Sequence, residues 1–192
     1  PVRNHILSRT VFAEAAILQV EVPIVTCTPQ SPCGTRVYEE GRAVPSRSAY
    51  TLTDVIVETS MGGCWTPSGW VLGEASWGTA DGSVSDEIFH RWSRPAGERL
   101  VGEIVVFPSH ANYFHWLIDL LPSFLSVWLR NDRAGYAVIG DAAAPGWVKR
   151  HAEALQVPVV WMKSQSVRPD IYHVVGKGRS CITRHELNLL SS

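Results

Sequence analysis

Short apolar runs alternate with helical periodicity in the second half of the chain. The runs at residues 136–139, 157–162 and 171–175 have the length and β-branched character of buried strands. Between the first two, residues 145–155 place apolar side chains on one helical face, with proline near the start. Strands that alternate with helices predict a parallel sheet with right-handed crossovers, so we expect a Rossmann-like α/β region over residues 99–192.

The clearest helical pattern covers residues 112–128. Apolar residues recur there at i, i+3, i+4 and i+7 and predict one buried stripe, made of Phe114, Leu117, Ile118, Leu121, Leu125 and Trp128. Asn112 is a residue type that caps helix N-termini. Pro122 removes one backbone hydrogen bond and predicts a kink that frees the carbonyl of Ile118. A strand candidate at residues 100–107 leads into this helix.

The first half of the chain has a different residue pattern. Residues 51–58 alternate and are rich in β-branched side chains, and residues 70–74 form a second strand pattern beyond a glycine-rich turn. Residues 28–48 are rich in Pro, Gly, Ser and Arg, which is typical of a loop. The sequence therefore predicts an α/β protein in two parts: a β-rich N-terminal region, residues 1–98, and the Rossmann-like region, residues 99–192.

Composition narrows the function classes. At 192 residues, 45% of them hydrophobic, the chain can bury a sizeable core in one or two domains. The net charge of -1, with no dense basic run, gives no support for nucleic-acid binding. The apolar stretch at residues 11–25 is broken by glutamates and proline, so no transmembrane segment is expected. No GxGxxG or P-loop motif follows a predicted strand, so the sequence contains no nucleotide-binding fingerprint.

The cysteines do not suggest a metal site. Cys27, Cys33, Cys64 and Cys181 form no CxxC pair and no Cys/His metal spacing. Their even number permits two disulfides, with Cys27 and Cys33 closing the shortest loop, but reduced buried thiols are more typical of a chain this long and apolar. No Asp-x-Asp pair is present, so nothing in the sequence calls for a metal ion or another cofactor.

His115 and Asp119 are the strongest candidates for chemistry. They lie four residues apart, about one helical turn, so their side chains share a face of an otherwise apolar helix. An imidazole and a carboxylate within reach form a proton-handling pair, because each biases the protonation of the other. The alternative is a purely structural role, in which His115 bridges two elements and Asp119 fixes its tautomer.

The sequence around this pair resembles a known family. Residues 112–119 read Asn-Tyr-Phe-His-Trp-Leu-Ile-Asp, and Leu121 and Pro122 follow. This is similar to the Asn-Tyr-Tyr-His-Trp-Leu-Leu-Asp…Leu-Pro-Arg signature of family 61 glycosyltransferases, which include bacterial capsule and lipopolysaccharide enzymes, plant xylosyltransferases and animal O-linked GlcNAc transferases. A weaker likeness extends over about residues 53–178. One position departs from the signature, since Ser123 stands where the family usually has arginine.

The resemblance implies an inverting glycosyltransferase of the two-domain GT-B type. Such an enzyme moves a sugar from a nucleotide-sugar to a hydroxyl of a glycan, polysaccharide or protein, and its C-terminal domain holds most of the donor. This chain would supply the acceptor side, with His115 as the base and Asp119 as its partner. The candidate substrate-binding residues are Asn112, Tyr113, Trp116 and His110.

Plainer roles accompany these candidates. Asn112 is more often a helix cap, Trp116 a core side chain and His110 a solvated loop residue. Residues 183–186 fit a capping box, whose helix stops after about two turns. We therefore expect a protein cut short before its nucleotide-sugar domain.

Two other function classes stay open. A non-catalytic fragment or pseudoenzyme would bind glycan or a partner chain, and Ser123 favours it. A hydrolase using the His115–Asp119 pair is the other, although no G-x-S-x-G elbow accompanies the pair. The absence of a disulfide framework and of an N-glycosylation sequon favours the bacterial cytoplasm, with a peripheral place at a membrane left open. The secretory lumen is the alternative for a eukaryotic enzyme.

Overall fold

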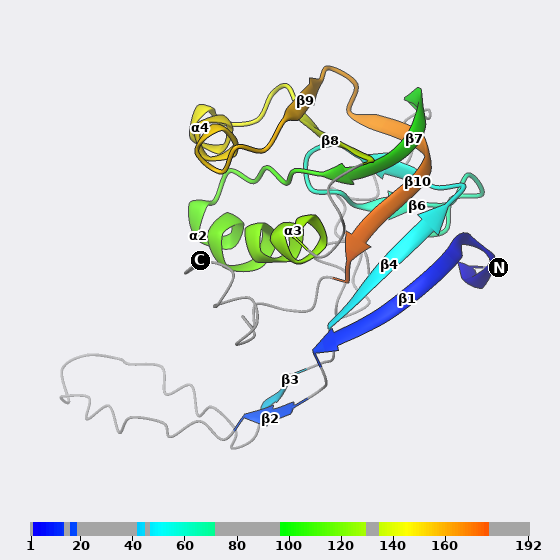
Figure 1. The fold of residues 1–192 in the computed structure, drawn as a ribbon. Coiled ribbons are helices and arrows are strands. Elements are labelled where there is room, and N and C mark those ends of the chain that lie inside the picture. The colour runs from blue at the N-terminus through cyan, green and yellow to red at the C-terminus, as the bar shows by residue number, and fades with distance from the viewer. Residues whose placement is uncertain are drawn as a thin grey trace, which may run out of the picture.

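Eight strands form one mixed sheet in the part of the chain that the structure describes (Figure 1). This computed structural model describes residues 2–13, 16–18, 42–44, 47–71, 97–129 and 135–176. The strands of the sheet are β1 (Ile6–Ala13), β4 (Arg47–Thr53), β5 (Ile56–Glu58), β6 (Cys64–Trp65), β7 (Glu98–Val106), β8 (Tyr136–Asp141), β9 (Val159–Met162) and β10 (Ser166–Val175). A separate pair consists of β2 (Ala16–Leu18) and β3 (Arg42–Val44).

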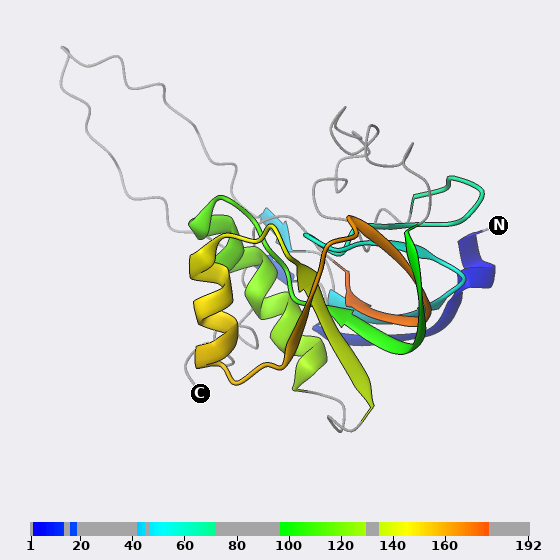
Figure 2. The same ribbon diagram turned by 90° about the horizontal axis from the view of Figure 1, so that it is seen from above.

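Helices follow β7 and β8 and lie on the same side of the sheet (Figures 1 and 2). After β7, the short helix α2 (Tyr113–His115), a π-helical turn η3 (Trp116–Leu120) and α3 (Leu121–Trp128) form one continuous run. After β8 comes α4 (Gly146–Ala154), and a 3₁₀ turn η1 (Val2–His5) precedes β1. Among the described residues, no helix combines the length and apolarity that a membrane span needs.

The strand order confirms the predicted parallel strands as one part of a mixed sheet. The order is β1-β4-β10-β7-β8-β9, and β10, β7, β8 and β9 run parallel to one another, whereas β10 is antiparallel to β4 and β5. The three predicted strands correspond to β8, β9 and β10, and the predicted helix at residues 145–155 is α4. β10 begins five residues earlier than expected, because Arg168, Pro169 and Asp170 hide the strand pattern in the sequence. The protein is thus of the α/β class.

The two predicted regions share this sheet. Both β4 and β5 come from residues 1–98 and pair antiparallel with β10. Residues 51–58 form two strands where the alternation predicted one, because Asp54 turns the backbone with a φ of 50°. The loop predicted at residues 28–48 was wrong where it is described, since it contains β3 and the start of β4. Of the strand predicted at residues 70–74, the described part is Trp70 and Val71, and Val71 bridges to Trp65. The boundary at residue 98 therefore does not divide the sheet.

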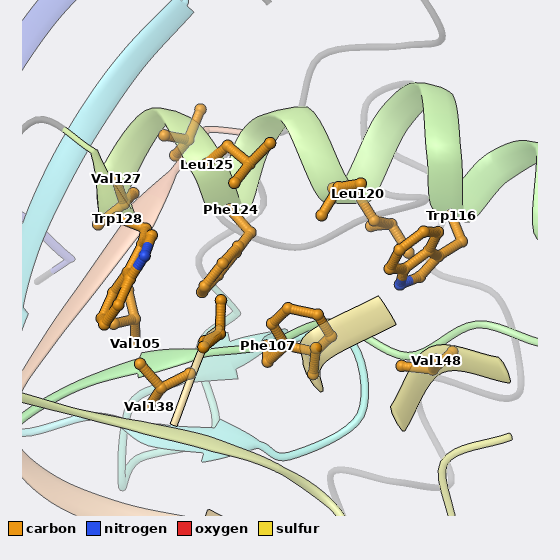
Figure 3. Packing of buried hydrophobic residues seen from close by; sticks show 14 of the residues in the cluster. Val105, Phe107, Trp116, Leu120, Phe124, Leu125, Val127, Trp128, Val138 and Val148 are labelled. Carbon is orange, nitrogen blue, oxygen red and sulfur yellow. The ribbon is translucent and has the colours of Figure 1, made fainter. Parts of the chain in front are cut away.

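The main core lies between the helices and the sheet (Figure 3). Along the helical run, Trp116, Leu120, Phe124 and Trp128 follow one another at i+4 spacing and point toward β7 and β8. Phe107, which is fully buried, packs edge-on against Phe124 with ring centroids 4.9 Å apart. Each such side chain contributes roughly 1.5–3 kcal/mol of hydrophobic stabilisation, so this layer fixes the helical run on the sheet.

The predicted apolar stripe is confirmed only in part. Leu121, Leu125 and Trp128 are buried, and Leu117 is half-buried, while the side chain of Ile118 lies outside the described part of the structure. Phe114 was wrongly placed in the stripe, because its side chain is 61% exposed. The π-helical turn after α2 changes the angular spacing of residues, so the buried face begins at Trp116, and Phe114 points away from it.

A second core on the other face of the sheet surrounds Tyr172. This side chain is 1% exposed, and its hydroxyl donates a hydrogen bond to the carbonyl of Gly62 at 2.7 Å. Cys64 is buried in the same cluster, while Cys27, Cys33 and Cys181 lie outside the described residues. Burial raises the pKa of Tyr172 well above its ordinary value, and the charges of Cys64 and Glu58 add to the rise.

This shift predicts a loss of stability in alkali. The unfolded chain releases the Tyr172 proton near pH 10, about its ordinary value, whereas the folded chain holds it. The contribution is therefore complete below about pH 10 and is lost as pH rises further. Urea unfolding between about pH 8 and 11 should show a steeper fall for the native chain than for Tyr172→Phe. Equal slopes for Tyr172→Phe and the native chain would contradict the assignment.

Candidate functional site

The candidate site lies just beyond the carboxyl end of β7. In open α/β sheets, ligands bind outside the carboxyl ends of the strands. A short connection of residues 107–111 leads from β7 to α2, which Asn112 caps as predicted. The Asn112 side-chain oxygen accepts hydrogen bonds from the backbone N–H groups of Phe114, at 3.0 Å, and His115, at 3.4 Å. The cap fixes the first turn of the helix and with it the backbone of His115.

His115 and Asp119 form the hydrogen-bonded pair that their spacing predicts. The Nδ1 atom of His115 lies 2.9 Å from Oδ2 of Asp119. The histidine side chain is 33% exposed, whereas the aspartate side chain is 3% exposed. One partner therefore reaches the protein surface while the other is anchored inside, which suits a pair that exchanges protons with a bound molecule.

The contact defines the role of each ring nitrogen. An ionised carboxylate only accepts hydrogen bonds, so Nδ1 of His115 carries a proton and donates it to Asp119. In the neutral ring the basic lone pair is then on Nε2. When Nε2 takes up a proton, the buried carboxylate beside the ring stabilises the resulting cation. The arrangement can perform general base catalysis through Nε2.

Asp119 sits in an irregular helical turn. The backbone N–H of Leu121 bonds to the carbonyl of Trp116, which closes the wide turn characteristic of a π-helix. Such turns inside α-helices are frequently found at functional sites. We predicted a kink at Pro122, and the irregular turn ends at Leu120, two residues before Pro122, which occupies the first turn of α3. Pro122 does not end the helical run, because α3 continues to Trp128.

The carboxylate of Asp119 is incompletely paired. Among the described residues, its Oδ1 atom is buried and has no hydrogen-bond partner. Leaving a buried polar atom unsatisfied costs roughly 1–3 kcal/mol, and more for a charged group. An unsatisfied buried polar atom in a native structure calls for an explanation, and a catalytic role is one of them. The unpaired Oδ1 therefore distinguishes this pair from an ordinary i, i+4 contact at the surface.

Two of the predicted substrate-binding residues differ sharply in exposure. Trp116 is fully buried, and its indole Nε1 donates a hydrogen bond to the carbonyl of Pro108 at 2.8 Å. Its ring is a core side chain and is not accessible for stacking on a sugar. Tyr113 is 49% exposed and stacks over Trp116 with ring centroids 6.3 Å apart. Phe114 presents a second exposed ring, 5.7 Å from the imidazole of His115.

His110 lies beside the pair. Its ring centroid is 5.9 Å from that of His115, and its Nδ1 accepts a hydrogen bond from the backbone N–H of Asn112 at 3.0 Å. The structure thus gathers His110, Asn112, Tyr113 and His115 at one end of the sheet, where the sequence predicted a site. The Asn112 oxygen is used for capping, as the plainer role of that residue requires.

Ser123 replaces the arginine of the resembled signature with a short buried side chain. It is 3% exposed, and its hydroxyl donates a hydrogen bond to the carbonyl of Asp119 at 2.7 Å. The residue therefore ties α3 to the π-helical turn, and no positive charge enters the site from this position. Sequence reasoning noted the substitution but not this contact.

The described residues contain no cluster of three or more His, Cys, Asp or Glu side chains suited to a metal ion. The capping box at residues 183–186 lies outside the described part of the chain. Sequence reasoning also missed a second polar cluster, in which His173 contacts Thr51 and Glu103. These residues come from three different strands, and nothing along the sequence signals the register that joins them.

No protein-family model, curated protein or solved structure matches this chain.

Proposed function

We propose that the chain is the acceptor-side part of an inverting glycosyltransferase, with His115 as its base. The observation that carries the proposal is the hydrogen bond of 2.9 Å between a surface-reaching imidazole and a buried carboxylate. The pair lies beyond the carboxyl end of a parallel strand, where this class of sheet binds ligands. Its residues also carry the likeness to the family 61 signature.

The transfer step follows from this geometry. An acceptor hydroxyl loses its proton to Nε2 of His115 while its oxygen attacks the anomeric carbon of the nucleotide-sugar. The bond from that carbon to the phosphate oxygen breaks, and the nucleotide leaves with the electron pair, so the configuration inverts. Asp119 stabilises the imidazolium that forms and keeps the ring in its productive tautomer. The nucleotide-sugar is a substrate, and the proposal requires no cofactor.

Features around the pair support a sugar acceptor. The exposed ring of Phe114 lies beside that of His115, Tyr113 presents a second exposed ring on the same helical turn, and aromatic faces suit the apolar side of a sugar ring. The strand and helix order after β7 also suits the Rossmann-like acceptor domain of a GT-B enzyme. In that arrangement a second domain would supply most contacts to the nucleotide.

A non-catalytic glycan-binding role is the second candidate. The observation that favours it is Ser123, whose hydroxyl is engaged by the helix backbone where the resembled signature carries a cation. A protein that keeps the aromatic surface but lacks this charge would retain acceptor binding without transfer.

A transfer assay separates these candidates. The purified chain, alone and together with any sequence encoded downstream of residue 192, is incubated with radiolabelled UDP-, GDP- and CMP-sugars and with oligosaccharide acceptors. Label in the acceptor, with inverted anomeric configuration by NMR, supports the transferase. Oligosaccharide binding without transfer in either form supports the binding protein. Hydrolysis of ester substrates by the short chain, without any nucleotide, would contradict both.

A further inference from the structure

A polar row crosses the helix-facing side of the sheet away from the His115 site. Thr51 on β4 and His173 on β10 are register partners, and Glu103 lies on the adjacent strand β7. Nδ1 of His173 is 3.2 Å from the hydroxyl of Thr51, and its Nε2 is 2.7 Å from the carboxylate of Glu103. These two contacts hold the imidazole of His173 in place through both ring nitrogens, and the residue is only 8% exposed.

The row determines what Thr51 offers a ligand. Because the carboxylate of Glu103 accepts a hydrogen bond, Nε2 of His173 carries the proton. In the neutral ring, Nδ1 then accepts the hydroxyl proton of Thr51. The Thr51 oxygen keeps its lone pairs for another partner and acts as an acceptor. The imidazole fixes the orientation of the Thr51 hydroxyl before a ligand binds, so binding does not have to order this group.

A cavity of about 140 Å³ adjoins this row. Its wall carries four hydroxyl side chains, from Ser8, Thr10, Thr51 and Ser126, together with His173 and parts of Ala49, Tyr50 and Val127. Ser126 is fully buried and its hydroxyl donates to the carbonyl of Pro122 at 2.8 Å, so this hydroxyl is not available to a ligand. A cavity of roughly 150 Å³ holds a benzene-sized ring. Ser8 and Thr10 on the wall are exposed, so the hydroxyl groups of a larger ring can extend toward solvent.

The wall selects a neutral, hydroxyl-rich ligand. Apart from His173, whose Nε2 is engaged by Glu103, its described side chains carry no titratable charge, so a charged ligand would lose hydration without gaining a counterion. The fixed acceptor Thr51 requires an O–H or N–H donor on the ligand, and the hydroxyls of Ser8 and Thr10 can donate or accept. A ring with several hydroxyl groups meets these demands.

Hydrolysis by Thr51 is a poorer interpretation of the same row. A nucleophilic hydroxyl needs backbone N–H groups nearby to stabilise an oxyanion. β4 lies between β1 and β10 and pairs with both, so the sheet uses the backbone groups around Thr51. The row therefore orients a hydroxyl for binding.

We infer that the cavity between β1, β4, β10 and the end of α3 binds a neutral polyhydroxylated six-membered ring, such as a pyranose or a cyclitol. Ser126 follows Asp119 by seven residues on the same helical run, about 10 Å along the axis at 1.5 Å per residue, so this site is separate from the His115 pair. The inference does not depend on sugar transfer at His115.

Ligand-detected NMR of the full chain tests this inference, with D-glucose and myo-inositol as neutral probes and D-glucuronate and D-glucosamine as charged ones. We expect saturation transfer to the neutral probes. Thr51→Val keeps the size of the side chain and should weaken neutral binding about three- to tenfold by removing the acceptor. Thr53→Val makes the same chemical change two residues along β4, at a hydroxyl that donates to the carbonyl of Asp170, and should leave the affinity unchanged.

The competing outcomes are distinct. A charged probe that binds as tightly as glucose, neutral binding that Thr51→Val leaves intact, or no binding of either neutral ring would each overturn the inference. His115→Ala should leave this affinity unchanged, which separates failure at this cavity from failure of the proposed transfer. Circular dichroism of Thr51→Val verifies that the folded chain is compared in every case.

Discussion

His115→Ala is expected to lower the rate of sugar transfer by about 10²–10⁴-fold, the range that a positioned general base contributes. The imidazole is the group of the pair that reaches the surface, and Asp119 is too deeply buried to take the acceptor proton itself. The rate is measured with saturating donor and acceptor in the assay that detects transfer. A loss of this size in kcat, with acceptor KM little changed, identifies a group that acts in the transition state.

Two further variants separate chemistry from stability. His115→Ala leaves the buried carboxylate of Asp119 without its partner, which can weaken the fold. His115→Asn places an amide N–H near the former Nδ1 position, so it can still bond to Asp119 but has no base. It should be as inactive as His115→Ala and closer to native in stability. His5→Ala removes a histidine whose contacts are with Thr53 and Asp54, and should retain transfer. Full activity in His115→Asn would eliminate the imidazole as the base.

Asp119→Asn tests whether the carboxylate positions the imidazole. The amide of asparagine can donate to Nδ1 of His115, which would move the ring proton to Nε2 and remove the basic lone pair. Transfer should then fall by about 10²–10⁴-fold although the side chains have the same shape. Nitrogen-15 NMR of the His115 ring reports which nitrogen carries the proton, and a structural role alone would not change it. An unchanged tautomer together with unchanged transfer would refute the assignment.

Trp116→Ala is expected to lower the free energy of unfolding by about 3–5 kcal/mol, as for other large buried aromatic residues. The ring is fully buried beside Phe107 and Trp147, and its indole satisfies the carbonyl of Pro108. Trp116→Phe keeps much of the apolar volume but loses that hydrogen bond, so a smaller loss of about 1–3 kcal/mol is expected. Urea denaturation followed by circular dichroism measures both.

Phe114→Ala provides the matched control for Trp116→Ala. The two residues are two positions apart on the same helical run, but Phe114 is 61% exposed. Truncating an exposed side chain usually changes stability by no more than about 0.5 kcal/mol. If the two truncations cost the same, the π-helical turn would not separate a buried face from an exposed one at this point.

Much of the fold could be predicted because its signals are local. The apolar runs of β8 and β9 and the amphipathic pattern of α4 depend only on neighbouring residues, and each element occurs where it was expected. The pairing of β4 and β5 with β10 could not be predicted, because it joins segments more than 100 residues apart. The different residue patterns of residues 1–98 and 99–192 suggested two regions, whereas the strands of both lie in one sheet.

In the candidate site, too, the local contacts could be predicted and the long-range contacts could not. His115 and Asp119 meet because one helical turn brings them together, so their spacing sufficed to predict the contact. The unpaired Oδ1 of Asp119 and the core position of Trp116 depend on what packs against the helix, which the sequence did not show. The Thr51–His173 contact requires the register of two distant strands and could be found only in the structure.

The central position of β10 has a consequence for how the chain can be divided. On one side it pairs with β7, and on the other with β4 and β5, from the first third of the chain. A fragment that begins after residue 58 would uncover a long edge of unpaired backbone, which is an established template for aggregation. The early strands thus protect the later α/β half from self-association, and neither half should stay monomeric when expressed without the other.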